Sequence, residues 1–357
     1  MKRILLSVVL LLILAAGGVF YFKRDDIAMR IFRQGVERNL GRDTAAALPD
    51  GLTAAFCGTG SPLPDRQRAG PCTAVIADGR LFVFDAGDGA TETLALMGLS
   101  PGKIEAVFLT HFHSDHIDGL GGVALQHWGT GAARAPLPVY GAEGVERVAA
   151  GFNEAYALDS GYRVAHHGPQ VVPPEGFGLA PHAFTIPEGQ ESVVVLDDGG
   201  VKIIAFRVDH GPVHPAVGYR IEYKGRSIVI SGDTSPTPML VRASQNADLM
   251  IVEGLSTRMV GEAEAIARAK GEEGIAHIFH DIPDYHTDPQ EAARMASEAH
   301  AGALALTHVI PPLPLAIMEG PYLGDARSRY SGPLWIMKDG DMIVLPAAGG
   351  IERRRAL

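Results

Sequence analysis

Short, largely apolar segments recur along the chain between turns rich in glycine, proline and aspartate. Apolar runs of about four to eight residues bounded by such turns are typical of buried strands. The later runs alternate with segments of helical spacing. The pattern predicts strands at Thr53–Cys57, Thr73–Ala77, Leu81–Asp85, Ile104–Thr110, Val139–Tyr140, Val201–Val208, Val217–Tyr223, Ser227–Ile230, Leu249–Val252, Ala303–Thr307, Leu334–Met337 and Met342–Leu345.

These elements form two β-rich halves, each with helices available to cover one face. They predict a fold of the α+β class, an αββα sandwich, over residues 52–346, with a tail at 347–357. In such a fold the functional side chains lie on loops at one end of the strands.

The amino terminus has a different pattern, an apolar run from Ile4 to Phe22 between Lys2-Arg3 and Lys23-Arg24. Its length suits one membrane-crossing helix, so residues 1–24 are predicted to be a transmembrane anchor. A signal segment cleaved near Ala15-Ala16-Gly17, giving a secreted protein, is the alternative. A short basic amino terminus favours the cytoplasmic side for that end. The catalytic domain is then expected on the extracytoplasmic, periplasmic side.

Residues 25–51 are predicted to be a juxtamembrane amphipathic helix and a linker, because Ile27, Ile31, Val36 and Leu40 recur near helical spacing. Two cysteines, Cys57 and Cys72, lie at the adjoining ends of two predicted strands. They form neither a zinc-finger nor a Cys-x-x-Cys pattern, so they do not define a site. A disulfide and two buried thiols both stay open.

The strongest chemical signal is the run His111-Phe112-His113-Ser114-Asp115-His116, which directly follows a predicted buried strand. Neutral imidazoles together with a carboxylate are ligands that suit zinc. The cluster is too small to saturate two ions. Further ligands are predicted where later strands end, namely His210, Asp233 and His308, with His214 as the competitor of His210.

With these residues the chain resembles the metallo-β-lactamase-fold hydrolases, and within them the ribonuclease Z and arylsulfatase-like branch. Gly58-Thr59-Gly60 and Asp85-Ala86-Gly87 match the opening motifs of that family. The resemblance implies two Zn²⁺ ions. It assigns His111, His113 and His210 to one ion, Asp115, His116 and His308 to the other, and Asp233 to a bridge between them.

The predicted catalytic residues are Asp115, His286 and Glu253. The resemblance implies a histidine before a helix, matched by His286-Thr287, and an acidic residue after a strand, matched by Glu253. Asp288-Pro289 reads as the start of that helix, which would hold His286 in place as a proton donor. Asp85 is expected to accept a hydrogen bond from the cluster.

The expected activity is hydrolysis of phosphodiesters, sulfate esters or similar small anionic esters. The alternatives are a ribonuclease Z-like endonuclease that processes tRNA 3′ ends, a lactonase or β-lactamase-like hydrolase, and a non-catalytic metal-binding protein on the same fold. The formal net charge of −10 and the expected anchor make nucleic acid an unexpected partner and the membrane an expected one. A homodimer stays open.

Overall fold

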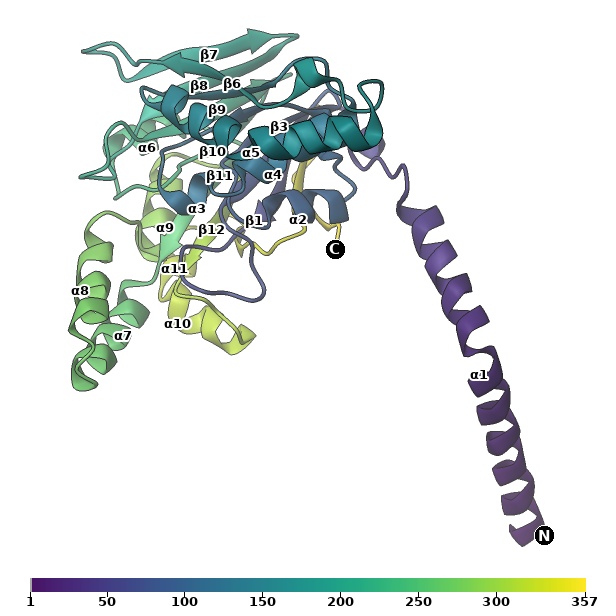
Figure 1. Ribbon diagram of the computed structural model, residues 1–357. Helices are drawn as coiled ribbons and strands as arrows, with labels where there is room; N and C mark the ends of the chain where they lie inside the picture. The colour runs from purple at the N-terminus through teal and green to yellow at the C-terminus, as the bar shows by residue number, and fades with distance from the viewer. Residues whose placement is uncertain (1) are drawn as a thin grey trace. The chain divides into compact units, whose positions relative to one another are not determined.

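The computed structural model describes the backbone of residues 2–357; for residues 2–3 and 12–19 it describes the helix but not the side chains. The chain divides into two compact units, Met1–Asp43 and Thr44–Leu357. The first unit holds one long helix, and the second holds all the strands (Figure 1).

The long helix α1 (Lys2–Asn39) corrects the expectation of a membrane anchor. Among the residues that the structure describes, no helix is long and apolar enough to cross a membrane. The apolar run is not an element of its own, because α1 continues without a break into Lys23, Arg24, Asp25 and Asp26. The transmembrane prediction and the membrane-anchored, extracytoplasmic location inferred from it are therefore wrong. The side chains of Ala15-Ala16-Gly17 lie outside the described residues.

In residues 44–357 the strands form two sheets, one of eight strands and one of seven. The order of the larger sheet is β15-β14-β1-β2-β3-β4-β5-β6, and that of the smaller sheet is β13-β12-β11-β10-β9-β8-β7. The strands of the larger sheet are β1 (Gly51–Gly58), β2 (Cys72–Ala77), β3 (Arg80–Phe84), β4 (Ile104–Phe108), β5 (Leu137–Ala142), β6 (Leu179–Phe184), β14 (Asp341–Pro346) and β15 (Glu352–Arg355). Those of the smaller sheet are β7 (Ser192–Asp198), β8 (Val201–Arg207), β9 (Val217–Tyr223), β10 (Arg226–Ile230), β11 (Leu249–Leu255), β12 (Leu304–Ile310) and β13 (Leu334–Ile336).

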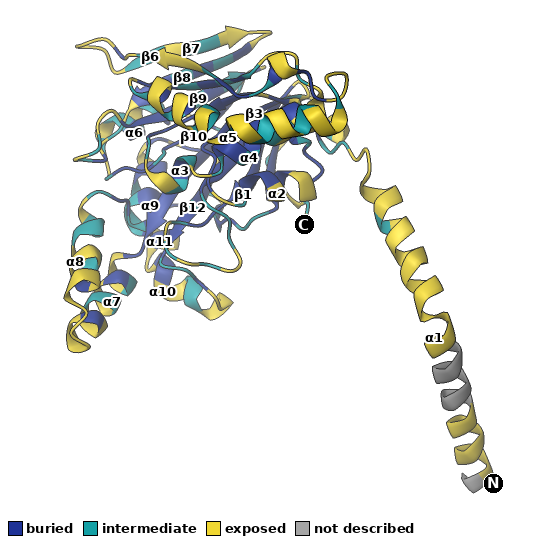
Figure 2. Cartoon of the chain, in the orientation of Figure 1, coloured by how far each residue is buried: buried dark blue, intermediate teal, exposed yellow. Residues whose placement is uncertain are grey.

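Alternation along single strands explains why both faces of the larger sheet are buried, as the dark strands of Figure 2 show. In β3, Phe82 and Phe84 join the cluster between the sheets, whereas Leu81 and Val83 join the cluster under the helices. Successive side chains of a strand point to opposite faces, so a continuous apolar run supplies both layers. The two sheets therefore pack face to face with helices outside, which confirms the αββα prediction.

The outer layers consist of helices that cover one sheet each. Helices α2 (Ala90–Leu96), α4 (Leu120–Gly131) and α5 (Val145–His167) contribute apolar side chains to the cluster on the larger sheet. The smaller sheet is covered by α6 (Pro238–Ala243), α9 (Pro289–Glu298), α10 (Glu319–Leu323) and α11 (Ala326–Arg329). The pair α7 (Thr257–Ala269) and α8 (Glu273–Asp281) packs largely on itself, and the single turn α3 (Ser114–Ile117) lies inside the histidine run.

Two features of the second unit go beyond the sequence pattern. Cys57 and Cys72 are joined by a disulfide that links the end of β1 to the start of β2. The segment after β14 is not only a tail, since β15 pairs antiparallel with β14.

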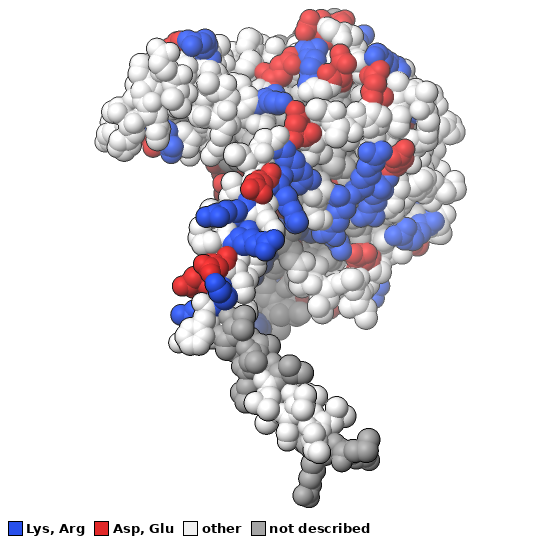
Figure 3. All heavy atoms as spheres, turned by 90° about the vertical axis from the view of Figure 1, so that its right-hand side faces the viewer, with Lys and Arg blue, Asp and Glu red and all other residues white. Residues whose placement is uncertain are grey.

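On the face of the molecule shown in Figure 3, basic and acidic side chains lie interspersed on the surface. The net charge of −10 is thus no measure of the charge on any one face.

Candidate metal centre

The candidate ligands come from the ends of four strands in two different sheets. β4 leads into the run His111–His116, and β8 is followed after two residues by His210. β10 leads into Asp233, and β12 itself carries His308. β4 lies in the larger sheet and the other three strands in the smaller one, so the site forms where the two sheets meet at one end of the sandwich.

A local irregularity aims His308 at the others. Between β11 and β12 the register pairs Glu253 with Thr307 and then Gly254 with Val309, leaving His308 as an extra residue. Its φ of 47° lies in the left-handed region, which non-glycine residues adopt rarely. A bulge of this kind redirects a side chain, and bulges are common beside active sites. His308 thus owes its position to the bulge.

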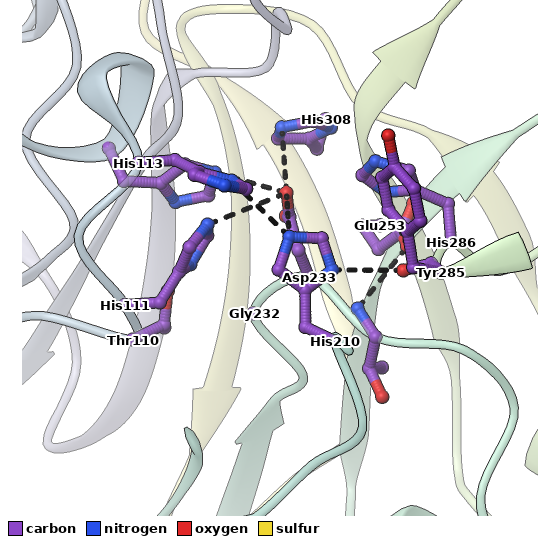
Figure 4. A network of polar contacts seen from close by, with 12 residues as sticks. Thr110, His111, His113, His210, Gly232, Asp233, Glu253, Tyr285, His286 and His308 are labelled. Carbon is purple, nitrogen blue, oxygen red and sulfur yellow. Dashed lines mark hydrogen bonds and ion pairs between the residues drawn. The ribbon is translucent and has the colours of Figure 1, made fainter. Parts of the chain in front are cut away.

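One carboxylate oxygen, Asp233 Oδ2, lies at the centre of the cluster (Figure 4). It is 3.3 Å from His116 Nε2 and 3.4 Å from His308 Nε2. It is 3.9 Å from the Nε2 atoms of both His111 and His210. His113 completes the group of histidines, since its Nδ1 lies 3.3 Å from His210 Nε2. Five imidazoles therefore surround one carboxylate.

The donor atoms fall into groups that fit metal ions. His111, His113, His210 and Asp233 offer atoms within 4.8 Å of one another, and so do Asp115, His116 and His308. Several of these atoms are buried without a hydrogen-bond partner, namely His111 Nε2, His116 Nε2 and Asp233 Oδ1. Buried polar atoms are normally paired, so these unpaired atoms indicate that the cluster binds a group from outside the chain. The donor set fits divalent metal, and its nitrogen and oxygen atoms suit zinc.

The other nitrogen of three imidazoles is held by a hydrogen bond. His116 Nδ1 donates to Asp85 Oδ2 at 2.8 Å, and His210 Nδ1 donates to the Tyr285 carbonyl at 2.9 Å. The Thr110 hydroxyl donates to Asp85 and lies 3.1 Å from His111 Nδ1. Such bonds fix the orientation of each imidazole and leave the lone pair of Nε2 free to bind a metal, as is usual for metal-binding histidines.

Two glycines let the supporting loops approach closely. A Cβ on Gly87, in Asp85-Ala86-Gly87, would lie 2.4 Å from the Asp115 carbonyl. Gly232, before Asp233, has a φ of +62°, and a Cβ there would lie 2.8 Å from Thr110 Cβ. Any side chain at either position would push the His111–His116 loop away from its partners.

His286 and Glu253 form a second polar group at the edge of the cluster (Figure 4). His286 Nδ1 donates to Glu253 Oε1 at 3.0 Å, and the same oxygen accepts from the Thr287 amide at 2.8 Å. Asp288 caps α9 through the Gln290 amide, which anchors the loop. His286 also offers an atom within 4.8 Å of donor atoms of Asp233 and His308. It therefore borders the cluster directly.

The protonation states follow from burial and from the neighbouring charges. Burial holds the pKa of His111 well below its usual range and lowers that of His210 to about 4. Burial opposes the charge on Asp233, but the imidazoles of His308 and His116 outweigh it and keep its pKa well below the usual range. Neutral imidazoles around an ionised carboxylate are in the form that metal binding requires.

Two histidines shift in the opposite direction. Burial opposes the positive charge on each, but neighbouring carboxylates outweigh it. Asp233 and Asp85 raise the pKa of His116 well above its usual value, so a metal must displace a proton from its Nε2. Glu253 raises the pKa of His286 to about 9. His286 is thus protonated at neutral pH, as a proton donor must be.

The structure thus brings all seven predicted ligands together, with His286 and Glu253 beside them. The competitor His214 lies outside the metal-fitting groups of the described residues and lines a neighbouring cavity instead. Sequence reasoning missed the Tyr285 carbonyl. No pattern could reveal it, because any residue supplies a carbonyl.

Comparison with known proteins agrees with this arrangement. Residues 65–308, more than half of the chain, match the metallo-beta-lactamase superfamily. The chain belongs to this superfamily. Its relatives include ribonuclease Z of Mycobacterium marinum, 36% identical over 79% of this chain and 94% of that protein. Ribonuclease Z of Mycolicibacterium gilvum is 37% identical over 72% of this chain and 83% of its own length.

Solved structures support the same superfamily fold. The short form of human tRNase Z has a TM-score of 0.59 at 23% identity, covering 82% of this chain and 99% of its own. The metallo-beta-lactamase fold protein YhfI of Bacillus subtilis has a TM-score of 0.57 at 22% identity, with the same coverage. With the relatives named ribonuclease Z at 36% and 37% identity, the chain is a hydrolase of this superfamily and matches its ribonuclease Z branch. The relatives named above are ribonucleases, which act on RNA. This finding contradicts the expectation that nucleic acid is not a partner.

Proposed function

We propose that this chain is a two-metal phosphodiesterase that cleaves RNA, as a ribonuclease Z-like endonuclease of tRNA 3′ ends. The observation that carries the proposal is the carboxylate of Asp233 at the centre of five imidazoles, in a chain related to ribonucleases Z over most of its length. This replaces small anionic esters as the expected main substrates.

His111, His113 and His210 would hold one ion, and Asp115, His116 and His308 the other, with Asp233 shared. Zinc is the metal we propose for both positions. Divalent ions bound there would acidify water and neutralise the charge that develops on a phosphodiester. The chain fixes both positions through the hydrogen bonds of Asp85 and the Tyr285 carbonyl. Asp115, partly exposed beside His308, would also orient the attacking water.

His286 would protonate the leaving oxygen. A ribose alkoxide leaves poorly without a proton, so phosphodiester cleavage in RNA needs a donor of this kind. Glu253 binds Nδ1 of His286, which leaves Nε2 free to carry the proton to the substrate. Glu253 also holds the Thr287 amide, so it positions the ring and keeps it charged. Glu253 is a positioning residue in this scheme.

The test is a substrate panel with the zinc-loaded protein. The panel contains an RNA stem with a single-stranded 3′ extension, bis(p-nitrophenyl) phosphate, p-nitrophenyl sulfate and a chromogenic cephalosporin. We expect one endonucleolytic cut at the junction of stem and extension, slower hydrolysis of the nitrophenyl phosphodiester, and loss of both activities in Asp233→Ala. Hydrolysis of the sulfate or the lactam without any cleavage of RNA would overturn the proposal.

A further inference from the structure

A cavity of about 610 Å³ lies beside the metal centre. Much of its lining is apolar and comes from three places in the chain: the end of β5, the end of β6, and the segments before and after His210. A cavity of this size accommodates one small organic group, such as a nucleoside. The apolar lining residues are Ala142, Phe184, Ile186, Val208, Pro215, Ala216 and Val217.

The cavity shares its walls with the metal centre. Asp209 and His214, both in its lining, flank the His210 loop. The amide of Val217 donates to the Thr110 carbonyl at 3.0 Å, next to His111. On the far side, the Phe112 ring lies close to Gly141 and Gly144, which bracket the lining residues Ala142 and Glu143: a Cβ added at either glycine would be 3.3 or 3.2 Å from that ring. The cavity therefore lies directly beside the residues that hold the cluster.

The charges of the cavity disfavour a phosphate as its occupant. Its one cation, Arg207, is tied down, because its guanidinium donates to the carbonyls of Ile186, Pro187 and Gln190. The carboxylate of Glu143 has no hydrogen bond or ion pair among the described residues, and that of Asp209 accepts only a 3.3 Å bond from the Gly211 amide. The cavity thus offers an apolar wall, the ring of Phe184 and two acceptors.

We propose that this cavity binds the nucleobase next to the scissile phosphate and prefers bases with an exocyclic amino group; this inference rests on the proposed function. Apolar and aromatic side chains bind the flat faces of bases. Carboxylates accept hydrogen bonds from the amino groups of cytosine, adenine and guanine. Uracil lacks an amino group: its one base-edge donor, N3–H, lies between two carbonyl oxygens that Glu143 and Asp209 would repel.

The test is calorimetric binding of CMP, UMP, ribose 5-phosphate and octyl phosphate to the zinc-loaded protein, which needs no turnover. One carboxylate–amino pair gives about tenfold discrimination. We expect CMP to bind about tenfold more tightly than UMP, and ribose 5-phosphate to bind more weakly than both. Glu143→Gln and Asp209→Asn should each bring the CMP:UMP ratio toward one.

Thr185→Trp, which places a large side chain in the lining, should weaken CMP binding at least about tenfold, toward that of ribose 5-phosphate. Ala183→Trp is the matched control, since Ala183 lies exposed on β6 two residues before Thr185 but does not line the cavity. Unchanged CMP binding by Thr185→Trp, or tighter binding of octyl phosphate than of CMP, would overturn the inference. Failure of the proposed function shows separately, as nucleotide binding without RNA cleavage.

Discussion

The metal centre and the cavity beside it are neighbours that are built in opposite ways. In the metal centre, His111, His116, His210 and His308 are buried, and the first three have their second nitrogen held by a hydrogen bond. In the cavity, the side chains of Glu143, Thr185 and His214 are exposed. Rigid strand ends thus fix the chemistry, whereas loops form the surface that distinguishes substrates. Substitutions in the two regions should therefore have different consequences.

The largest effect is expected where the metal centre has its shared carboxylate. Asp233→Ala should remove the common oxygen between the two groups, so that metal content falls and kcat/KM on RNA drops by about 10³-fold or more. Metal analysis and RNA cleavage measure both effects. Asp197→Ala, an exposed aspartate on β7, is the control and should keep both properties. Near-normal turnover of Asp233→Ala would show that this carboxylate does not hold the metals together.

The next effect concerns proton donation rather than metal binding. His286→Ala should keep both metals and lose about 10²-fold in kcat on RNA, because the leaving alkoxide then departs without a proton. Bis(p-nitrophenyl) phosphate has a good leaving group, so its hydrolysis should be far less impaired. Equal losses on both substrates would point to positioning of the phosphate. Loss of a metal ion would instead place His286 among the ligands.

A smaller effect should come from the hydrogen bond beneath the cluster. Asp85→Asn keeps the shape of the side chain but weakens its bond to His116 Nδ1, so zinc affinity should fall by about 10–100-fold. Competition with a zinc chelator measures it. Asp88→Asn, on the same turn, is the control. If affinity is unchanged, His116 does not depend on Asp85 for its orientation.

The smallest effect is expected in the His286–Glu253 pair. The carboxylate raises the pKa of His286, so its proton is present below about pH 9 and is lost as pH rises through that value. Glu253→Gln removes the negative charge, which lowers the pKa of His286. The falling limb of the RNA cleavage profile should therefore move to lower pH, with a loss of about tenfold above neutrality. An unmoved limb would show that another group titrates there.

The contrast between the two regions also marks what the sequence could predict. The six consecutive residues from His111 to His116 predict the metal centre. His210 and Asp233 could be predicted because each follows an apolar strand. The bulge that turns His308 inward has no such signal, since it depends on the pairing of β11 with β12. The direction of the His308 side chain is therefore decided by strand pairing, which the local sequence does not show.

The cavity wall was beyond prediction for a related reason. β6, which forms part of that wall, is mostly exposed, so it shows no clear period. An element with few buried side chains shows little periodicity of apolar residues in the sequence. The opposite error occurred at the amino terminus, where the apolar run from Ile4 suggested an independent membrane helix. There, local composition did not show that the helix continues into charged residues.

The most direct test is a zinc titration of metal-free protein while cleavage of an RNA stem with a 3′ extension is followed. There are two groups of donors, and Asp233 lies in one of them and close to His116 and His308 of the other. We therefore expect the rate to rise until two equivalents of zinc per chain are bound and then to stay constant. Saturation at one equivalent, or no RNA cleavage at any zinc content, would contradict a two-metal RNA phosphodiesterase.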